Sequence, residues 1–192
     1  MAEPNPEELF NLGMLSYDKQ DFSKDKGYFE KACDLNNGGG CSFSGDLYRS
    51  GDGVKQDLTK AAQFYSKACE LKEGVWCGAL GGLYYNGDGV KQDSKKAVAL
   101  FEKACDLNNS GGCSFLGDLY RSGDGVKQDS KKAAQFYSKG CELNNSFGCS
   151  ALGMLYKYGQ GVEKNLTKAA QFYSKACKLG SQKACEILKE LK

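Results

Sequence analysis

The chain has 192 residues, 26 lysines and arginines against 24 aspartates and glutamates, and no histidine, which gives a formal net charge of +2. The two signs of charge are interspersed, so the sequence has no basic stripe that could neutralise the phosphates of a nucleic acid. No apolar run approaches the roughly 20 residues needed to cross a bilayer. We therefore expect no nucleic-acid partner and no membrane insertion, and we expect a monomer.

Ten cysteines organise the chain into a regular array. They form five pairs whose members are eight residues apart, and corresponding cysteines in successive pairs are 36 residues apart. A fixed period in this range is typical of a solenoid of stacked supersecondary units. The pairs are Cys33 with Cys41, Cys69 with Cys77, Cys105 with Cys113, Cys141 with Cys149, and Cys177 with Cys185.

Two explanations fit such paired cysteines, disulfide bonds and zinc sites. Structural zinc sites favour ligands about two to four residues apart and often use histidine, which this chain lacks. Ten regularly paired thiols in a small chain are typical of an oxidising compartment, so we favour disulfides that join the end of one helix to the start of the next. We therefore expect a secreted or periplasmic protein from which a signal peptide has been removed.

The predicted elements are pairs of short helices. In the first unit a helix begins at Pro6, with Glu7 and Glu8 at its favourable end, and a second helix covers about residues 22–35. The connection between these helices is four residues shorter than the one in the next unit. Such an atypical terminal unit is expected to cap an array.

Four further units repeat one pattern. Each begins with a short helix that ends at a Gly-x-Gly turn followed by valine, and a preferred N-cap residue then starts a second helix with one apolar face. A glycine in each first helix permits close approach of its partner helix. The N-cap residues are Asp57, Asp93, Asp129 and Asn165, and the first-helix glycines are Gly45, Gly81, Gly117 and Gly153.

The domain prediction is one array over residues 1–192. It contains five αα units at about 5–36, 37–72, 73–108, 109–144 and 145–180, followed by a capping helix within 181–192, which makes about eleven helices. Residues 41–72 and 113–144 differ at only five positions, a similarity typical of a recently duplicated or an engineered chain.

The repeated motif resembles a known family. In the last unit it reads Leu-Gly-x-Leu-Tyr at 152–156, Gly-x-Gly-Val at 159–162 and Lys-Ala-Ala-x-Phe-Tyr-x-Lys-Ala-Cys at 168–177. This motif resembles Sel1-like repeats, relatives of the tetratricopeptide αα-hairpin, and with a cysteine pair in every unit the chain resembles the Helicobacter cysteine-rich proteins. The resemblance implies an all-α fold, a right-handed αα-hairpin solenoid clipped by disulfides, with a concave surface lined by the first helices.

A row of first-helix residues is the candidate binding site. By helical angle these residues point away from the core, and aromatic and arginine side chains are frequent anchors at interfaces, so we expect a protein or peptide ligand in the concave groove. The alternative is a solvated face in which Asp46 and Arg49 form only a local charge pair. The row comprises Ser42, Phe43, Asp46, Arg49, Ser50, Tyr85, Asn86, Phe115, Asp118, Arg121, Met154, Lys157 and Tyr158.

Catalysis is the rival class, because the resemblance also implies penicillin binding or weak β-lactamase activity. Ser-x-x-Lys sequences occur at Ser16 to Lys19 and at Ser23 to Lys26, but the Ser-Asp-Asn and Lys-Thr-Gly elements of such enzymes are absent from the sequence. The lack of histidine removes the commonest general base. We therefore predict no catalytic residue, no metal ligand and no cofactor.

Overall fold

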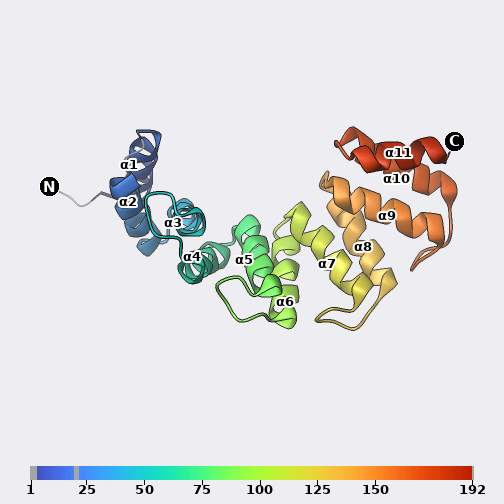
Figure 1. The fold of residues 1–192 in the computed structure, drawn as a ribbon, viewed down its shortest axis with the longest axis horizontal. Coiled ribbons are helices and arrows are strands. Elements are labelled where there is room, and N and C mark those ends of the chain that lie inside the picture. Colours follow the sequence, from blue (N-terminus) through green and yellow to red (C-terminus); the bar gives the residue numbers. More distant parts are fainter. Residues whose placement is uncertain (1–3, 20–21, 192) are drawn as a thin grey trace. The chain divides into compact units, whose positions relative to one another are not determined.

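The computed structural model describes residues 4–19 and 22–191, with the side chains of Phe22 and Ser23 left undescribed. Within these ranges the chain is entirely helical apart from turns and short connections (Figure 1). None of the helices in this part of the chain has the length and apolar character to cross a membrane. The helices are α1 (Pro6–Asp18), α2 (Phe22–Asp34), α3 (Gly38–Ser50), α4 (Leu58–Glu70), α5 (Gly74–Asn86), α6 (Ser94–Asp106), α7 (Ser110–Ser122), α8 (Ser130–Glu142), α9 (Ser146–Tyr158), α10 (Leu166–Lys178) and α11 (Gln182–Glu190).

The chain divides into two compact units. The N-terminal unit, Met1–Asp93, contains α1 to α5, and the C-terminal unit, Ser94–Lys192, contains α6 to α11. Within each unit every helix packs against the next one in sequence, and in the C-terminal unit α7 also contacts α9. Each unit is an all-helical stack of αα-hairpins, as the sequence predicts.

Local sequence sets where the helices begin and end. The side chain of Asp57 accepts a hydrogen bond from the backbone N–H of Lys60 at 3.0 Å, and Asn165 caps α10 in the same way. The α3 helix ends at Gly51, whose φ of +84° is a left-handed angle that glycine adopts without steric cost. The predicted caps at Asp57, Asp129 and Asn165 are confirmed.

Five disulfides join successive helix pairs and use all ten cysteines. Each ties the last turn of a second helix to the first turns of the following first helix, with Cα atoms 4.5 to 4.8 Å apart. The pairing predicted from the spacing of eight residues is therefore confirmed. No bridge spans the turn inside a hairpin.

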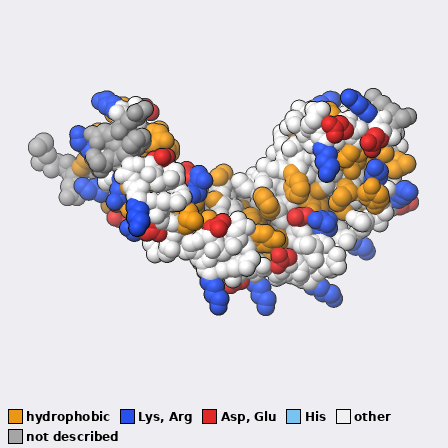
Figure 2. All heavy atoms as spheres, in the orientation of Figure 1, with side chains coloured by type: hydrophobic (Ala, Val, Ile, Leu, Met, Phe, Trp, Pro, Cys, Tyr) orange, Lys and Arg blue, Asp and Glu red, His pale blue; other side chains and the backbone are white. Residues whose placement is uncertain are grey.

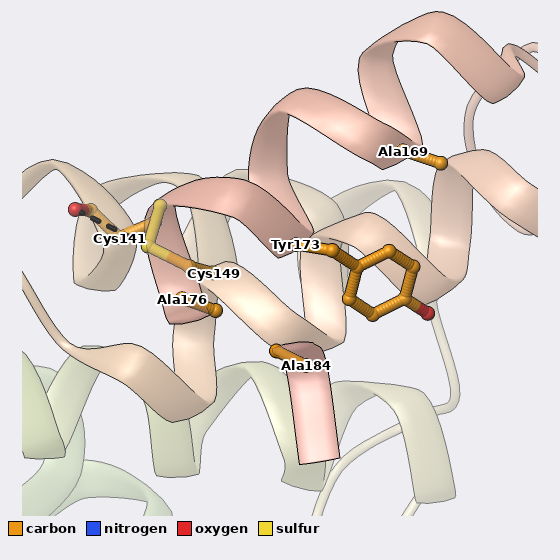
Figure 3. Packing of buried hydrophobic residues seen from close by; sticks show 6 residues of the cluster. All are labelled: Cys141, Cys149, Ala169, Tyr173, Ala176 and Ala184. Atoms are coloured by element: carbon orange, nitrogen blue, oxygen red, sulfur yellow. Dashed lines mark hydrogen bonds between the residues drawn. A yellow bond between two sulfur atoms is a disulfide. The ribbon is translucent and has the colours of Figure 1, made fainter. Parts of the chain in front are cut away.

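Small buried side chains surround one buried ring, Tyr173, between the last helices. At the C-terminal end, Ala169, Tyr173 and Ala176 of α10 form one buried cluster with Ala184 of α11 and the disulfide between α8 and α9 (Figure 3). Ala184 is 1% exposed, so α11 covers the last apolar face, as expected of a capping helix. In α7, a methyl group at Gly117 would lie 2.7 Å from the Tyr137 ring, so the glycine is needed for this close approach.

Candidate binding site

In two repeat units, an aspartate and an arginine of the first helix are tied to a tyrosine of the second helix. In the C-terminal unit, Arg121 donates from Nε and Nη2 to Asp118 Oδ1 at 3.1 and 2.7 Å. Tyr137 Oη donates to the same carboxylate oxygen at 3.0 Å. We refer to Asp118, Arg121 and Tyr137 as the C-terminal Asp-Arg-Tyr cluster.

The N-terminal unit contains the same arrangement. Tyr65 Oη donates to Asp46 Oδ1 at 2.7 Å, and Arg49 Nη2 lies 3.3 Å from that oxygen. These three residues form the N-terminal Asp-Arg-Tyr cluster. Asp46 and Arg49 are therefore more than a local charge pair, because both also bond a tyrosine that lies on the packed face of α4.

Burial raises the pKa of the tyrosine in both clusters. Loss of solvent raises the pKa of the Tyr65 and Tyr137 phenols above the ordinary value, and the neighbouring aspartate adds to this effect. The pKa of Arg121 is also raised, first by its hydrogen bond to Asp118. Both phenols thus remain donors at neutral pH, and in each cluster the aspartate and the tyrosine orient the guanidinium by hydrogen bonds.

A cavity of about 460 Å³ lies beside the C-terminal cluster. Helices α7, α9 and α11 supply most of its lining, and Figure 2 shows hydrophobic side chains gathered on this unit. Apolar side chains and a few polar groups converge in it, a combination typical of ligand sites. The lining residues are Asp118, Arg121, Tyr137, Ser146, Phe147, Ser150, Ala151, Met154, Tyr173, Ser181, Lys183, Ala184 and Ile187.

The Sel1 repeat model matches residues 9–37, 40–73, 77–109, 110–145 and 146–181, one match for each helix pair. The chain belongs to the Sel1 repeat family. Its matches cover most of the chain and include both Asp-Arg-Tyr clusters.

The similar proteins include Helicobacter cysteine-rich proteins. A stretch of 54 residues, 28% of this chain, is 54% identical to the Helicobacter pylori protein named "Beta-lactamase HcpA" and spans 22% of that protein's length. The structure of Helicobacter pylori cysteine rich protein B is 47% identical over 70% of this chain and 97% of that chain, with a TM-score of 0.58. Five disulfides and these relatives indicate an oxidising compartment outside the cytoplasm.

Another solved structure covers almost the whole chain. It is a protective antigen present in uropathogenic Escherichia coli strains, with an SLR fold. The TM-score is 0.91 at 30% identity, over 97% of this chain and 41% of that one. This likeness extends to all of the helix pairs of this Sel1 repeat protein.

The Sel1 repeats of the C-terminal unit bring only some of the predicted contact residues together. Asp118, Arg121 and Met154 line the cavity. Phe115 is 56% exposed, and its ring stacks on Phe101 with centroids 5.4 Å apart. Lys157 and Tyr158 lie at the end of α9, where the lysine Nζ is 5.5 Å from the tyrosine ring centroid, outside the cavity lining.

In the N-terminal unit, two residues of the predicted row are less exposed than expected. Phe43 is half-buried and stacks on Phe29 at 5.0 Å, so less of its ring is available to a partner than the sequence suggests. Ser42 is 5% exposed, and the prediction that it points away from the core is wrong, because its hydroxyl bonds Gly38 O at 2.8 Å.

The remaining row residues of this unit stay at the surface. Asn86 is the last residue of α5, and its side-chain amide donates to the Asp88 carboxylate at 3.1 Å. Tyr85 is 38% exposed, and Ser50 is exposed at the end of α3.

The predicted row contains three of the thirteen cavity residues, and those it missed include Phe147, Ser150, Lys183 and Ile187. Phe147 is 48% exposed, and its ring meets that of Tyr137 edge-on with centroids 6.1 Å apart. It lies two residues before the second cysteine of its pair, where the three preceding pairs have glycine or valine and the last pair has Lys183. That local difference was the one available signal, because Lys183 and Ile187 join the site only through the packing of α11.

Proposed function

We propose that this Sel1 repeat scaffold is a secreted or periplasmic protein that binds a protein or peptide segment, with the C-terminal cavity as its main contact. The observation that carries the proposal is the meeting of partly exposed apolar side chains with an ion-paired guanidinium in one cavity of about 460 Å³. Phe115, whose ring centroid lies 6.4 Å from that of Phe147, extends the apolar surface beyond it. Exposed apolar surface rimmed by polar groups is typical of interaction sites.

The energetics favour a partner that inserts an apolar side chain. Burying one leucine or phenylalanine side chain contributes about 1.5–3 kcal/mol, and the same event covers Phe147, Met154 and Ile187. Disulfides tie α9 to α8 and α11 to α10, so the walls are held in place before binding. A preorganised site loses less conformational entropy when its ligand arrives.

Selection from a peptide library tests this function directly. We expect peptides selected on the oxidised protein to bind it saturably and to lose about tenfold or more in affinity with Phe147→Ser. Val75→Ser is the matched control, because Val75 holds the same position in the α5 repeat and is 60% exposed in the other unit. Failure to select any binder, or equal binding by the Phe147 variant, would contradict the proposal.

The second candidate function is β-lactam binding or turnover, favoured by the names of relatives that match about a quarter of this chain. Ser16 and Lys19 are joined by a backbone bond at 3.1 Å, from the lysine N–H to the serine carbonyl, which closes α1. The side chain of Ser23 lies outside the described residues.

Hydrolysis of nitrocefin separates the two functions. Under the scaffold proposal, the Ser16→Ala and Ser23→Ala variants leave the rate at the level of the unaltered protein. Saturable turnover that either substitution abolishes would establish the second candidate instead.

A further inference from the structure

Three Sel1 repeats place a serine directly after the second cysteine of a pair, and two of these serines are satisfied. Ser42 Oγ lies 2.8 Å from both Gly38 O and Glu73 Oε2. Ser114 Oγ lies 3.0 Å from both Ser110 O and Asn145 Oδ1. In both cases one of the two partners is the N-cap residue of the next first helix.

The third serine, Ser150, differs. Its Oγ is shielded from solvent and has no hydrogen-bond partner among the described residues. The N-cap residue that follows it is Ser181, a shorter side chain than Glu73 or Asn145, and Ser181 Oγ already accepts a bond from the Ala184 N–H at 3.3 Å. A desolvated hydroxyl without a partner costs free energy that a ligand group can recover.

Ser150 lines the same cavity as two cations. Asp118 is the one carboxylate in the lining, and its Oδ1 already accepts bonds from Arg121 and Tyr137. Lys183, exposed in the first turn of α11, adds a positive charge that no other carboxylate of the lining balances. The Arg121 side chain is 41% exposed, so its charge also reaches a ligand.

We propose, building on the peptide-binding function, that this cavity recognises the C-terminal residue of a partner chain that ends in an apolar side chain. The side chain packs on Phe147, Met154 and Ile187. The α-carboxylate pairs with Lys183 and Arg121. Ser150 Oγ, shielded in the unbound protein, turns about the Cα–Cβ bond into the cavity and bonds the last peptide group. Every one of these groups lines the same cavity.

A chain end fits better than an internal segment, for a geometric reason. The terminal residue carries a side chain and a carboxylate on one Cα, so both enter a single cavity together. In an internal segment, the carboxylate of an acidic residue and the apolar side chain belong to two different residues. The backbone of such a segment must also leave the cavity again.

Two probes that differ in one group test the inference on the full oxidised chain. We expect N-acetyl-Gly-Gly-Phe with a free carboxylate to shift the amide NMR signals of Ser150 and Lys183 saturably. The corresponding C-terminal amide should bind about tenfold more weakly, since a charge-assisted contact is lost.

Charge reversal on α11 provides a matched control. Lys183→Glu should weaken binding of the free acid about tenfold, whereas Lys189→Glu, an equal change of charge on an exposed residue of the same helix outside the cavity lining, should leave it unchanged. Ser150→Ala should weaken binding of both probes by a few-fold, because each retains the last peptide group.

Three results would overturn the inference: equal affinity for acid and amide, equal effects of the two lysine variants, or no saturable shift with the acid. The proposed function is judged separately, because library peptides that bind through Phe147 establish it whether or not a free carboxylate is required.

Discussion

The two Asp-Arg-Tyr clusters have almost the same sequence around them but different surroundings. In the N-terminal unit, Trp76 stacks on Tyr65 with ring centroids 4.8 Å apart and an interplanar angle of 20°. In the C-terminal unit, Phe147 meets Tyr137 at 81°, and the cavity opens beside the cluster. The repeated motif therefore sets the position of an arginine, while the following first helix decides what lies next to it.

Removal of a disulfide is the strongest way to test this difference. Replacing Cys141 and Cys149 by serine should lower the free energy of unfolding by about 2–4 kcal/mol and weaken peptide binding, because α9 is then released from α8. Replacing Cys69 and Cys77 should cost similar stability and leave the binding affinity unchanged. Thermal unfolding and peptide titration measure both effects, and equal losses of affinity would contradict the assignment of the site to the C-terminal unit.

Loss of a cluster hydroxyl should have a smaller effect. Tyr137→Phe and Tyr65→Phe each remove one donor to an aspartate, which should lower the free energy of unfolding by about 1 kcal/mol. Urea unfolding of both variants compares the two surroundings, with Tyr158→Phe, at a 61% exposed position, as the control. A difference between the two losses would show that Trp76 or Phe147 contributes to the cluster beside it.

These clusters also predict a dependence on alkaline pH. Burial raises the pKa of Tyr65 and Tyr137 in the folded state, so the stabilisation is fully present below the unfolded value near about 10 and is lost as pH rises through the higher folded value. The free energy of unfolding should therefore fall above about pH 10. The free energy of unfolding should fall less steeply with pH in Tyr65→Phe and in Tyr137→Phe than in the unaltered protein. The same pH dependence in all three proteins would show that these two phenols do not cause the fall.

The smallest expected effect concerns residue 72, one of the five positions at which residues 41–72 differ from residues 113–144. Lys72 has φ +66°, a left-handed angle that asparagine holds at Asn36, Asn108 and Asn144. Lys72→Asn should raise the free energy of unfolding by about 0.5 kcal/mol, and Asn144→Lys should lower it by a similar amount, because asparagine tolerates this angle better. Chemical unfolding of the pair measures the effect, and changes of the same sign would refute the explanation.

The fold could be predicted from the sequence because its signals are local. Cysteines eight residues apart bracket one helix junction, and Asp57 and Gly51 mark a helix start and a helix end by their own backbone preferences. The family resemblance rests on the same repeated local pattern. None of these signals depends on contacts between distant residues.

The candidate site was only partly predictable, because it depends on packing between helices. The angle of Asp118 and Arg121 on α7 indicated a shared face, but Tyr137 reaches them from α8 over Gly117. Phe43 was expected to face a partner, whereas rings from α1 and α2 surround it. Lys183 gained a role only because α11 brings it to the cavity.

The disulfides also determine what a protease could do to this protein. Every bridge closes a short loop between consecutive hairpins, and none crosses the Gly-x-Gly turn within a hairpin. A single cut between Gly123 and Val126 would thus sever the covalent chain even with all five bridges intact. The two fragments would then be held together by helix packing alone, and they would separate on a denaturing gel without any reducing agent.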